Sequence, residues 1–221
     1  MTQYEANLKS VLERIEKAQK LSPFDENIKL IAVSKSVTSK EVTQLFEAGC
    51  RAFGENKVQV LKQKRDELES LDIEWHFIGR LQTNKINQLI DLRPALIHSC
   101  DSLELAQQIN KRVREKNLDI LLQINSAKEQ SKAGVMPELA LSTYEQILAT
   151  CPKLNLKGVM SIGAHTDDTK LIQQSFEITR GIFERAVSFG AKHCSMGMSG
   201  DFELAIQCGA NMLRVGTILF K

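Results

Sequence analysis

The sequence lacks a charge excess of either sign and lacks any long apolar run. Its 29 Lys and Arg residues nearly balance its 27 Asp and Glu residues, which gives a formal net charge of +2 at pH 7. That charge is too small to indicate nucleic acid or an acidic membrane as a partner. Residues 1–20 contain acids and no apolar core, so they resemble neither a signal peptide nor a membrane span. We therefore expect a cytoplasmic protein.

Cysteine and histidine occur without the spacings that bind metal. No C-x-x-C pair is present among the five cysteines, which are Cys50, Cys100, Cys151, Cys194 and Cys208. This pattern argues against a disulfide framework or a zinc site and favours a reducing compartment. His98, His165 and His193 follow no metal-binding spacing either, so we expect them to be structural or at the surface.

The sequence also lacks a Pro/Gly/Ser-rich linker, a low-complexity segment and an internal repeat. Nothing therefore marks a domain boundary, and residues 1–221 are predicted to form a single domain. The composition, 43% hydrophobic and 25% charged, is typical of an ordinary soluble globular protein.

Apolar runs alternate with amphipathic segments along the whole chain. The predicted strands cover residues 29–33, 51–53, 73–78, 95–98, 119–124, 157–162, 193–196 and 210–215. The predicted helices cover residues 4–19, 41–48, 58–69, 84–92, 102–115, 136–149, 167–188 and 200–208. This alternation favours a single (β/α)8 TIM barrel, since each crossover favours a parallel neighbour; an open doubly wound sheet is the alternative. Little chain follows the last strand, so the extra N-terminal helix is predicted to cover that flank.

The first predicted strand, residues 29–33, directs attention to Lys35. Its apolar run ends on Ser34 and Lys35, which places the lysine at the C-terminal edge of the sheet. Ligands bind at that edge in parallel α/β folds. A lysine there can form a Schiff base with an aldehyde, although a lysine that ends a strand is also commonly a solvated surface residue.

Two segments near the C-terminus have the features of phosphate-binding loops. Gly197 leads from the seventh strand into Ser199 and a helix, so free N–H groups, a helix dipole and a hydroxyl meet there. Gly216 and Thr217 follow the last strand and offer amides and a second hydroxyl. Barrels most often hold phosphate after these two strands. Ser199 acting only as a helix N-cap is the alternative.

Lys35 and these two loops together describe a site for a phosphorylated aldehyde, because the first and last strands of a closed barrel are neighbours. Pyridoxal 5'-phosphate has both groups. Arg214, on the last strand, is placed to face the ring nitrogen of that cofactor. Its permanent charge would keep the nitrogen unprotonated and weaken the ring as an electron sink.

Six short motifs occur in order along nearly the whole chain. They are A-V-S-K at 32–35, F-G-E-N at 53–56, W-H-F-I-G-R-L-Q-T-N-K at 75–85, S-K-A-G at 131–134, M-G-M-S at 196–199 and R-V-G-T at 214–217. This set resembles the pyridoxal phosphate homeostasis protein family, with W-H-F-I-G and M-G-M-S as its most specific segments. The resemblance implies an alanine-racemase-like N-terminal barrel without the second β domain of the racemase, and a monomer.

The resemblance also implies roles for single residues. Lys35 matches the lysine that forms the Schiff base with pyridoxal 5'-phosphate. The residues that match the phosphate ligands and the partner of the pyridine nitrogen are Ser199, Gly216, Thr217 and Arg214. The other residues that match the lining of the pocket are Asn56, His76 and Met198. For His76 a second interpretation is a hydrogen-bonded core histidine, and Trp75 is expected in the core.

The sequence departs from the family at the rim of this pocket. Lys57 and Val60 stand where the family has an aromatic residue or arginine and an acid, and the chain ends L-F-K where the family ends with a glycine. These positions lie outside the implied ligand contacts.

Three functions are compatible with such a site. The first is a carrier for intracellular pyridoxal phosphate homeostasis, with pyridoxal-phosphate-dependent apoenzymes as candidate recipients and no committed reaction. It is favoured because Tyr4 and Tyr144 both lie within predicted helices, whereas a racemase needs a second acid/base opposite the lysine. The second is a weak racemase-type enzyme in which a cysteine or histidine replaces that tyrosine. The third is a Schiff-base aldolase that acts on a sugar phosphate.

Overall fold

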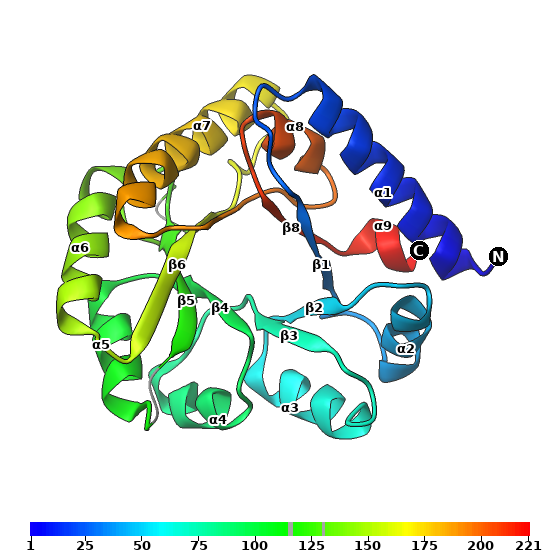
Figure 1. The fold of residues 1–221 in the computed structure, drawn as a ribbon, viewed down its shortest axis with the longest axis horizontal. Coiled ribbons are helices and arrows are strands. Elements are labelled where there is room, and N and C mark those ends of the chain that lie inside the picture. The colour runs from blue at the N-terminus through cyan, green and yellow to red at the C-terminus, as the bar shows by residue number, and fades with distance from the viewer. Residues whose placement is uncertain (115–116, 130) are drawn as a thin grey trace.

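The computed structural model describes residues 1–114, 117–129 and 131–221. Its strands pair in chain order, all parallel, and β1 closes the barrel against β8 (Figure 1). The strands are β1 (Lys29–Val33), β2 (Ala52–Glu55), β3 (Glu74–Phe77), β4 (Leu96–Cys100), β5 (Leu118–Ile124), β6 (Leu154–Ser161), β7 (His193–Ser195) and β8 (Met212–Val215). The predicted (β/α)8 barrel is confirmed, and the open doubly wound sheet is wrong.

Helices form the outer layer around the barrel (Figure 1). The helices that follow β1 to β7 are α2 (Ser39–Glu47), α3 (Val58–Glu67), α4 (Ile86–Asp91), α5 (Leu103–Arg112), α6 (Ala140–Thr150), α7 (Thr169–Ala186) and α8 (Phe202–Gln207). Three short 3-10 helices adjoin them, η1 (Thr83–Lys85), η2 (Pro137–Leu139) and η3 (Val187–Phe189). Across the part of the chain that is described, no helix has the length and apolar character needed to cross a membrane.

The helix before the first strand, α1 (Gln3–Leu21), covers the flank beside β8. It begins at a capping box in which Thr2 Oγ1 accepts from the Glu5 N–H at 3.2 Å. Its buried stripe consists of Leu8, Val11, Ile15 and Ala18. It packs against α8 and the one-turn helix α9 (Thr217–Phe220), and Asn7 Nδ2 donates to the Lys221 carbonyl at 2.8 Å. The predicted shielding role of the N-terminal helix is therefore confirmed.

β1 pairs with both β2 and β8, which brings the first and last strands of the sequence side by side. Ala32 lies opposite Phe53 of β2 on one side and opposite Val215 of β8 on the other. The loops that follow β1, β2 and β8 consequently emerge side by side at the C-terminal edge of the barrel. This arrangement brings Lys35 next to the R-V-G-T segment.

The apolar core has two parts. The larger part lies between the barrel and the helices, where Trp75 is almost fully buried and its ring centroid lies 6.0 Å from that of Phe53. The smaller part lies inside the barrel and consists of Ile31, Ala52, Leu96, Leu121, Met160 and Met212. The expectation that Trp75 belongs to the core is confirmed.

Some element boundaries differ from the prediction. β6 begins at Leu154 and includes Asn155, whose Nδ2 donates to Asp119 Oδ1 at 2.7 Å on the neighbouring strand. A polar residue satisfied in this way does not look like part of a strand in the sequence. The end of the helix predicted over 102–115 falls at Glu115, outside the described residues, as does residue 130 of the predicted loop 125–134.

Candidate functional site

A cavity of about 820 Å³ opens at the C-terminal ends of the strands. Its walls come from segments at or after the ends of β1, β2, β3, β6, β7 and β8. The predicted site residues that line it are Lys35, Asn56, Met198, Ser199, Arg214, Gly216 and Thr217. Six stretches that are distant in the sequence therefore contribute to one opening. Of the predicted set, His76 does not line it.

Lys35 lies on the turn between β1 and α2. Ser34 is fully buried, and its N–H donates to the Gly54 carbonyl at 3.0 Å, which extends the pairing of β1 with β2 beyond the end of the strand. The next helix begins at once, since Thr38 and Glu41 form a capping box in which the Thr38 N–H donates to the Glu41 carboxylate at 2.7 Å. The chain turns outward after Ser34, so the Lys35 side chain is exposed at the cavity wall.

A buried ion pair supports this turn from behind. Lys64 Nζ lies 2.6 Å from Glu55 Oε1 and donates to the Ser34 carbonyl at 2.5 Å. Ser34 Oγ donates to the same Glu55 oxygen at 2.7 Å. Loss of one partner of such a buried pair is strongly destabilising, so the pair holds the backbone from which Lys35 extends. The role of neither charged residue was predicted, although Glu55 belongs to the F-G-E-N motif and Lys64 falls on the buried stripe of α3 with Val58 and Leu61.

The loop after β7 contacts the loop after β8. The Gly216 N–H donates to Ser199 Oγ at 3.1 Å, which joins the two segments predicted to bind phosphate. Gly197 has φ of +95°, and a Cβ added there would lie 2.7 Å from the Ala205 side chain of α8. Because only glycine meets both requirements without strain, Gly197 fixes the path of the loop that carries Ser199.

Ser199 is not the N-cap of α8. That helix begins at Phe202, and Asp201 occupies the N-cap position. The Met198 N–H donates to Asp201 Oδ1 at 2.6 Å, which folds the loop back before the helix. The interpretation of Ser199 as a simple N-cap is therefore wrong, and its hydroxyl stays at the cavity.

Arg214 brings a buried cation to the inner wall of the cavity. Its side chain is 5% exposed, with Nη1 donating to Ser195 Oγ at 2.6 Å and Nη2 donating to the Ser161 carbonyl at 2.8 Å. Burial lowers the pKa of Arg214 to about 10, and the charge of nearby Asp201 opposes this shift, so the group remains cationic at neutral pH. Among the described residues no carboxylate lies within ion-pairing distance of it. The guanidinium therefore has no direct ion-pair partner in the described part of the protein, although the charge of Asp201 acts on it from a greater distance.

Asn56 and Met198 complete the predicted residues on the rim. Asn56 follows β2 and is half-buried, and Gly79 follows the neighbouring β3. A Cβ on Gly79 would lie 1.9 Å from the Asn56 carbonyl oxygen, so the glycine lets these two loops touch. Met198 is 39% exposed at the outer edge.

His76 lies below the cavity, inside the barrel. Ile78, on the same face of the chain, lines the cavity, whereas His76 does not. The His76 side chain is 1% exposed, its Nδ1 lies 2.9 Å from His98 Nε2, and its Nε2 lies 3.1 Å from Glu74 Oε1. The structure does not support the predicted placement of His76 in the pocket lining. Its second interpretation, a hydrogen-bonded core histidine, matches these contacts.

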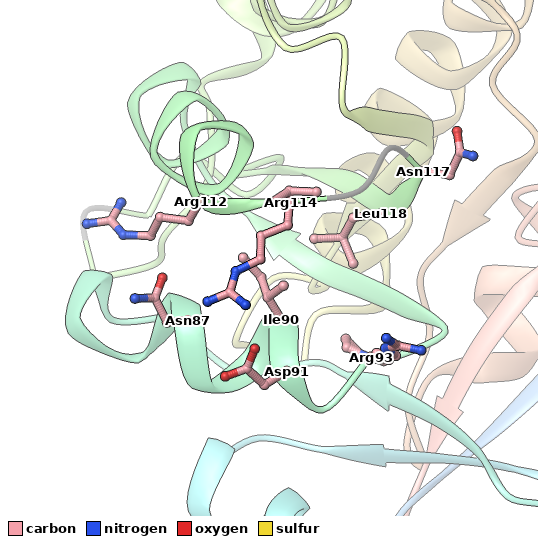
Figure 2. A pocket seen from close by; sticks show the side chains of 10 residues that line it. Asn87, Ile90, Asp91, Arg93, Arg112, Arg114, Asn117 and Leu118 are labelled. Carbon is pink, nitrogen blue, oxygen red and sulfur yellow. The ribbon is translucent and has the colours of Figure 1, made fainter.

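A second hollow, of about 730 Å³, lies beside the N-terminal end of β5 (Figure 2). It carries the guanidinium groups of Arg93, Arg112 and Arg114, and the Arg114 side chain extends toward Asp91 (Figure 2). Its described lining includes neither an amine nor a hydroxyl side chain. The strand-end cavity, which has both, is therefore the candidate site.

Comparison with known proteins identifies the family. A family model described as "Alanine racemase, N-terminal domain" matches residues 6–221. A relative named "Pyridoxal phosphate homeostasis protein" from Helicobacter pylori strain J99 is 51% identical over 223 residues, which cover 100% of both chains. The chain belongs to the pyridoxal phosphate homeostasis protein family. A member from Homo sapiens is 32% identical and aligns over 96% of this chain and 84% of its own. The resemblance carried by the six motifs is confirmed.

Solved structures agree with this family. PipY of Synechococcus elongatus, solved with PLP bound, has a TM-score of 0.83 and 30% identity, and the match covers 99% of this chain and 100% of PipY. An alanine racemase from Corynebacterium glutamicum has a TM-score of 0.72 at 18% identity, over 93% of this chain and 59% of the racemase. The racemase shares the fold, and the homeostasis protein family shares both fold and sequence.

Proposed function

We propose that this protein binds pyridoxal 5'-phosphate reversibly in the strand-end cavity and serves intracellular homeostasis of that cofactor. It buffers and delivers the cofactor without a committed reaction. The observation that carries the proposal is the meeting of an exposed lysine, two hydroxyl-bearing loops and a buried arginine in one cavity. The relatives named pyridoxal phosphate homeostasis protein and the PLP-bound PipY structure support it.

The groups that line the cavity fit this cofactor. Lys35 offers an amine for the aldehyde. Ser199 and Thr217 offer hydroxyls and Thr217 offers an amide, which suits the phosphate anion. The Gly216 N–H lies beside them, where it donates to Ser199 Oγ and would have to turn to or be shared with the phosphate. When bound, the cofactor supplies an aldehyde and a ring that can accept electrons.

Arg214 limits what that ring can do. A guanidinium is a donor at all physiological pH values, so Arg214 would donate to the ring nitrogen of the bound cofactor and would keep that nitrogen unprotonated. An unprotonated ring withdraws electrons less strongly, which suits retention of the cofactor more than turnover.

Besides Lys35 and Arg214, the titratable side chains in the described cavity lining are Glu41 and the terminal Lys221. The Glu41 carboxylate is engaged at its own helix cap, where it accepts from the Thr38 N–H at 2.7 Å and from Thr38 Oγ1 at 2.9 Å. Tyr144 is fully buried in α6, where its hydroxyl donates to the Leu156 carbonyl at 3.0 Å and burial raises its pKa. Tyr4 lies on α1, on the outside of the barrel. The described lining of the cavity contains no tyrosine, histidine or cysteine. This composition supports a carrier over a racemase-type enzyme.

The proposal extends to the whole chain. We infer that residues 1–221 act as one cofactor-binding domain, that the protein works as a monomer in the cytoplasm, and that apoenzymes requiring pyridoxal phosphate receive the cofactor. The continuous barrel and the full-length match to curated relatives support the single domain.

Replacement of the lysine tests the proposal. The loaded protein is expected to show a visible absorbance band that is lost in Lys35→Ala, because the other lysine of the described lining, Lys221, lies at the end of the sequence and not on the turn after β1. Lys57→Ala, at an exposed position that does not line the cavity, is the matched control and is expected to keep the band. A Lys35→Ala protein that keeps the band contradicts the proposal. Exchange of the α-hydrogen of any amino acid with solvent deuterium, lost in Lys35→Ala, would establish a racemase-type activity instead.

A further inference from the structure

A continuous run of polar side chains extends from the cavity down into the barrel. Arg214 Nη1 lies 2.6 Å from Ser195 Oγ, which lies 3.1 Å from His98 Nδ1. His98 Nε2 lies 2.9 Å from His76 Nδ1, and His76 Nε2 lies 3.1 Å from Glu74 Oε1. These residues belong to β8, β7, β4 and β3, so the run crosses the interior of the barrel from one wall to the other. We refer to it as the buried chain.

The donor and acceptor roles in the buried chain follow from its two ends. Arg214 can only donate, so Ser195 Oγ accepts from it and is free to donate its own hydrogen to His98 Nδ1. His98 then carries its proton on Nε2 and donates to His76 Nδ1. His76 in turn carries its proton on Nε2 and donates to the Glu74 carboxylate, which can only accept. Every hydrogen in the chain therefore points from the arginine toward the carboxylate.

This single direction requires both histidines to be neutral. His98 is fully buried, and burial lowers its pKa well below the ordinary value, with the positive charge of Arg214 adding to the effect. Burial also lowers the pKa of His76, although the Glu74 carboxylate opposes that shift. Each imidazole thus has one N–H and one acceptor nitrogen at neutral pH, as the chain needs.

Other charged groups face the buried chain from the floor of the barrel. Lys29 of β1 forms an ion pair with Glu74, and its charge lowers the pKa values of both His76 and His98. His193 of β7 also faces His98, and Asp119 and Lys157 lie near His193 with opposite charges. Apart from Glu74, these groups make no hydrogen bond to the two histidines in the described part of the chain.

We propose that Ser195 and His98 are positioning residues for Arg214, and that His76 and Glu74 fix the tautomer of His98 on which this positioning depends. The hydroxyl of Ser195 is committed to His98, so its lone pairs are held toward the guanidinium. The second anchor of Arg214, the Ser161 carbonyl, fixes only one nitrogen. Together the two anchors hold the guanidinium plane toward the ring nitrogen of the bound cofactor. This inference rests on the proposed function, because it concerns how the same site holds the ring.

Two variants break the buried chain at different places. Ser195→Ala removes one anchor of Arg214, and His98→Gln frees the Ser195 hydroxyl to turn. The matched control is His193→Gln. It changes a histidine on the floor of the barrel that is not part of the buried chain of hydrogen bonds. Circular dichroism and thermal melting establish that each variant folds. The probe is pyridoxal 5'-phosphate itself, titrated into each protein.

The readout is the absorbance spectrum of the bound cofactor as a function of pH. Ser195→Ala and His98→Gln are expected to shift the midpoint of the cofactor's titration by about 0.5 pH unit or more. The reason is that a weakened hydrogen bond from Arg214 to the cofactor changes the relative stability of the cofactor's protonated and unprotonated forms by a comparable amount. His193→Gln is expected to behave like the parent. Parent-like titrations in both chain variants, with the cofactor bound, would overturn the inference while leaving the proposed function intact.

The tautomers give a second test that needs no cofactor. Nitrogen-15 spectra of the imidazole side chains are expected to show His76 and His98 both neutral and both protonated on Nε2 at pH 7. A proton on Nδ1 of either residue would overturn the inferred direction of the hydrogen bonds in the buried chain. A parent protein that never binds the cofactor would overturn the proposed function and, with it, the positioning role.

Discussion

At the scale of single residues, burial decides what each polar side chain inside the barrel can do. His98 is surrounded by protein on every side and has no carboxylate in direct contact, so its charged form is disfavoured in the folded state. In the unfolded chain the same residue titrates near pH 6.5. Folding therefore carries a dependence on pH that can be assigned to this residue.

We predict that stability falls as the pH drops below about 6.5, the unfolded-state pKa of histidine. Below that pH the unfolded chain binds a proton at His98 that the folded protein does not bind, so acid favours unfolding. The slope from this one residue is at most about 1.4 kcal/mol per pH unit, and above pH 6.5 its contribution is constant. Urea unfolding between pH 7.5 and pH 5 measures it. His98→Gln is expected to show a shallower decline, and an equal decline in both proteins contradicts the prediction.

At the scale of elements, the loops after β7 and β8 form the side of the cavity that we propose binds phosphate, and their contact depends on glycine. The bond between the Gly216 N–H and Ser199 Oγ exists only if the chain passes α8 closely at Gly197. Gly200, in the same loop, has nothing near the place where a side chain would go. The two glycines therefore offer a matched pair of substitutions.

We predict that Gly197→Ala weakens retention of pyridoxal 5'-phosphate about tenfold or more and destabilises the protein by about 1–3 kcal/mol, because the residue would hold a positive φ and meet Ala205. Gly200→Ala is expected to leave both properties unchanged. Equilibrium dialysis and urea unfolding measure the two effects. Unchanged retention in Gly197→Ala would remove this loop from the phosphate site.

The sequence predicted the elements that rely on local signals. The apolar run ending at Lys35 and the glycine-flanked Ser199 are both contained in a few residues, and the structure places them in one cavity. His76 was predicted less well, because its position in a strand does not show how deep in the barrel it lies. Depth depends on the register between β3 and its neighbours, which no local pattern encodes.

At the scale of the whole molecule, closure of the barrel creates the site. Lys35 and Thr217 are separated by most of the sequence, and they line one cavity because β1 pairs with β8. The alternation of strands and helices favoured this closure but left an open doubly wound sheet as the alternative, which the pairing of β1 with β8 excludes. The polar interior was not predictable, since His76, His98 and Ser195 resemble surface residues in sequence and become buried only when four strands enclose them.

The same closure places two lysines in the described lining of the strand-end cavity, Lys35 and the terminal Lys221. We propose the covalent role for Lys35 because its turn is held by the buried pair of Glu55 and Lys64.

Borohydride reduction of the cofactor-loaded protein, followed by peptide mass spectrometry, tests this claim most directly. We predict one pyridoxyl group per protein molecule, on the peptide that contains Lys35. When free phosphate is present in large excess during loading, we predict no pyridoxyl group on that peptide. A pyridoxyl group found instead on Lys64, Lys132 or Lys221, or a loaded protein that yields no reduced adduct, would contradict the account.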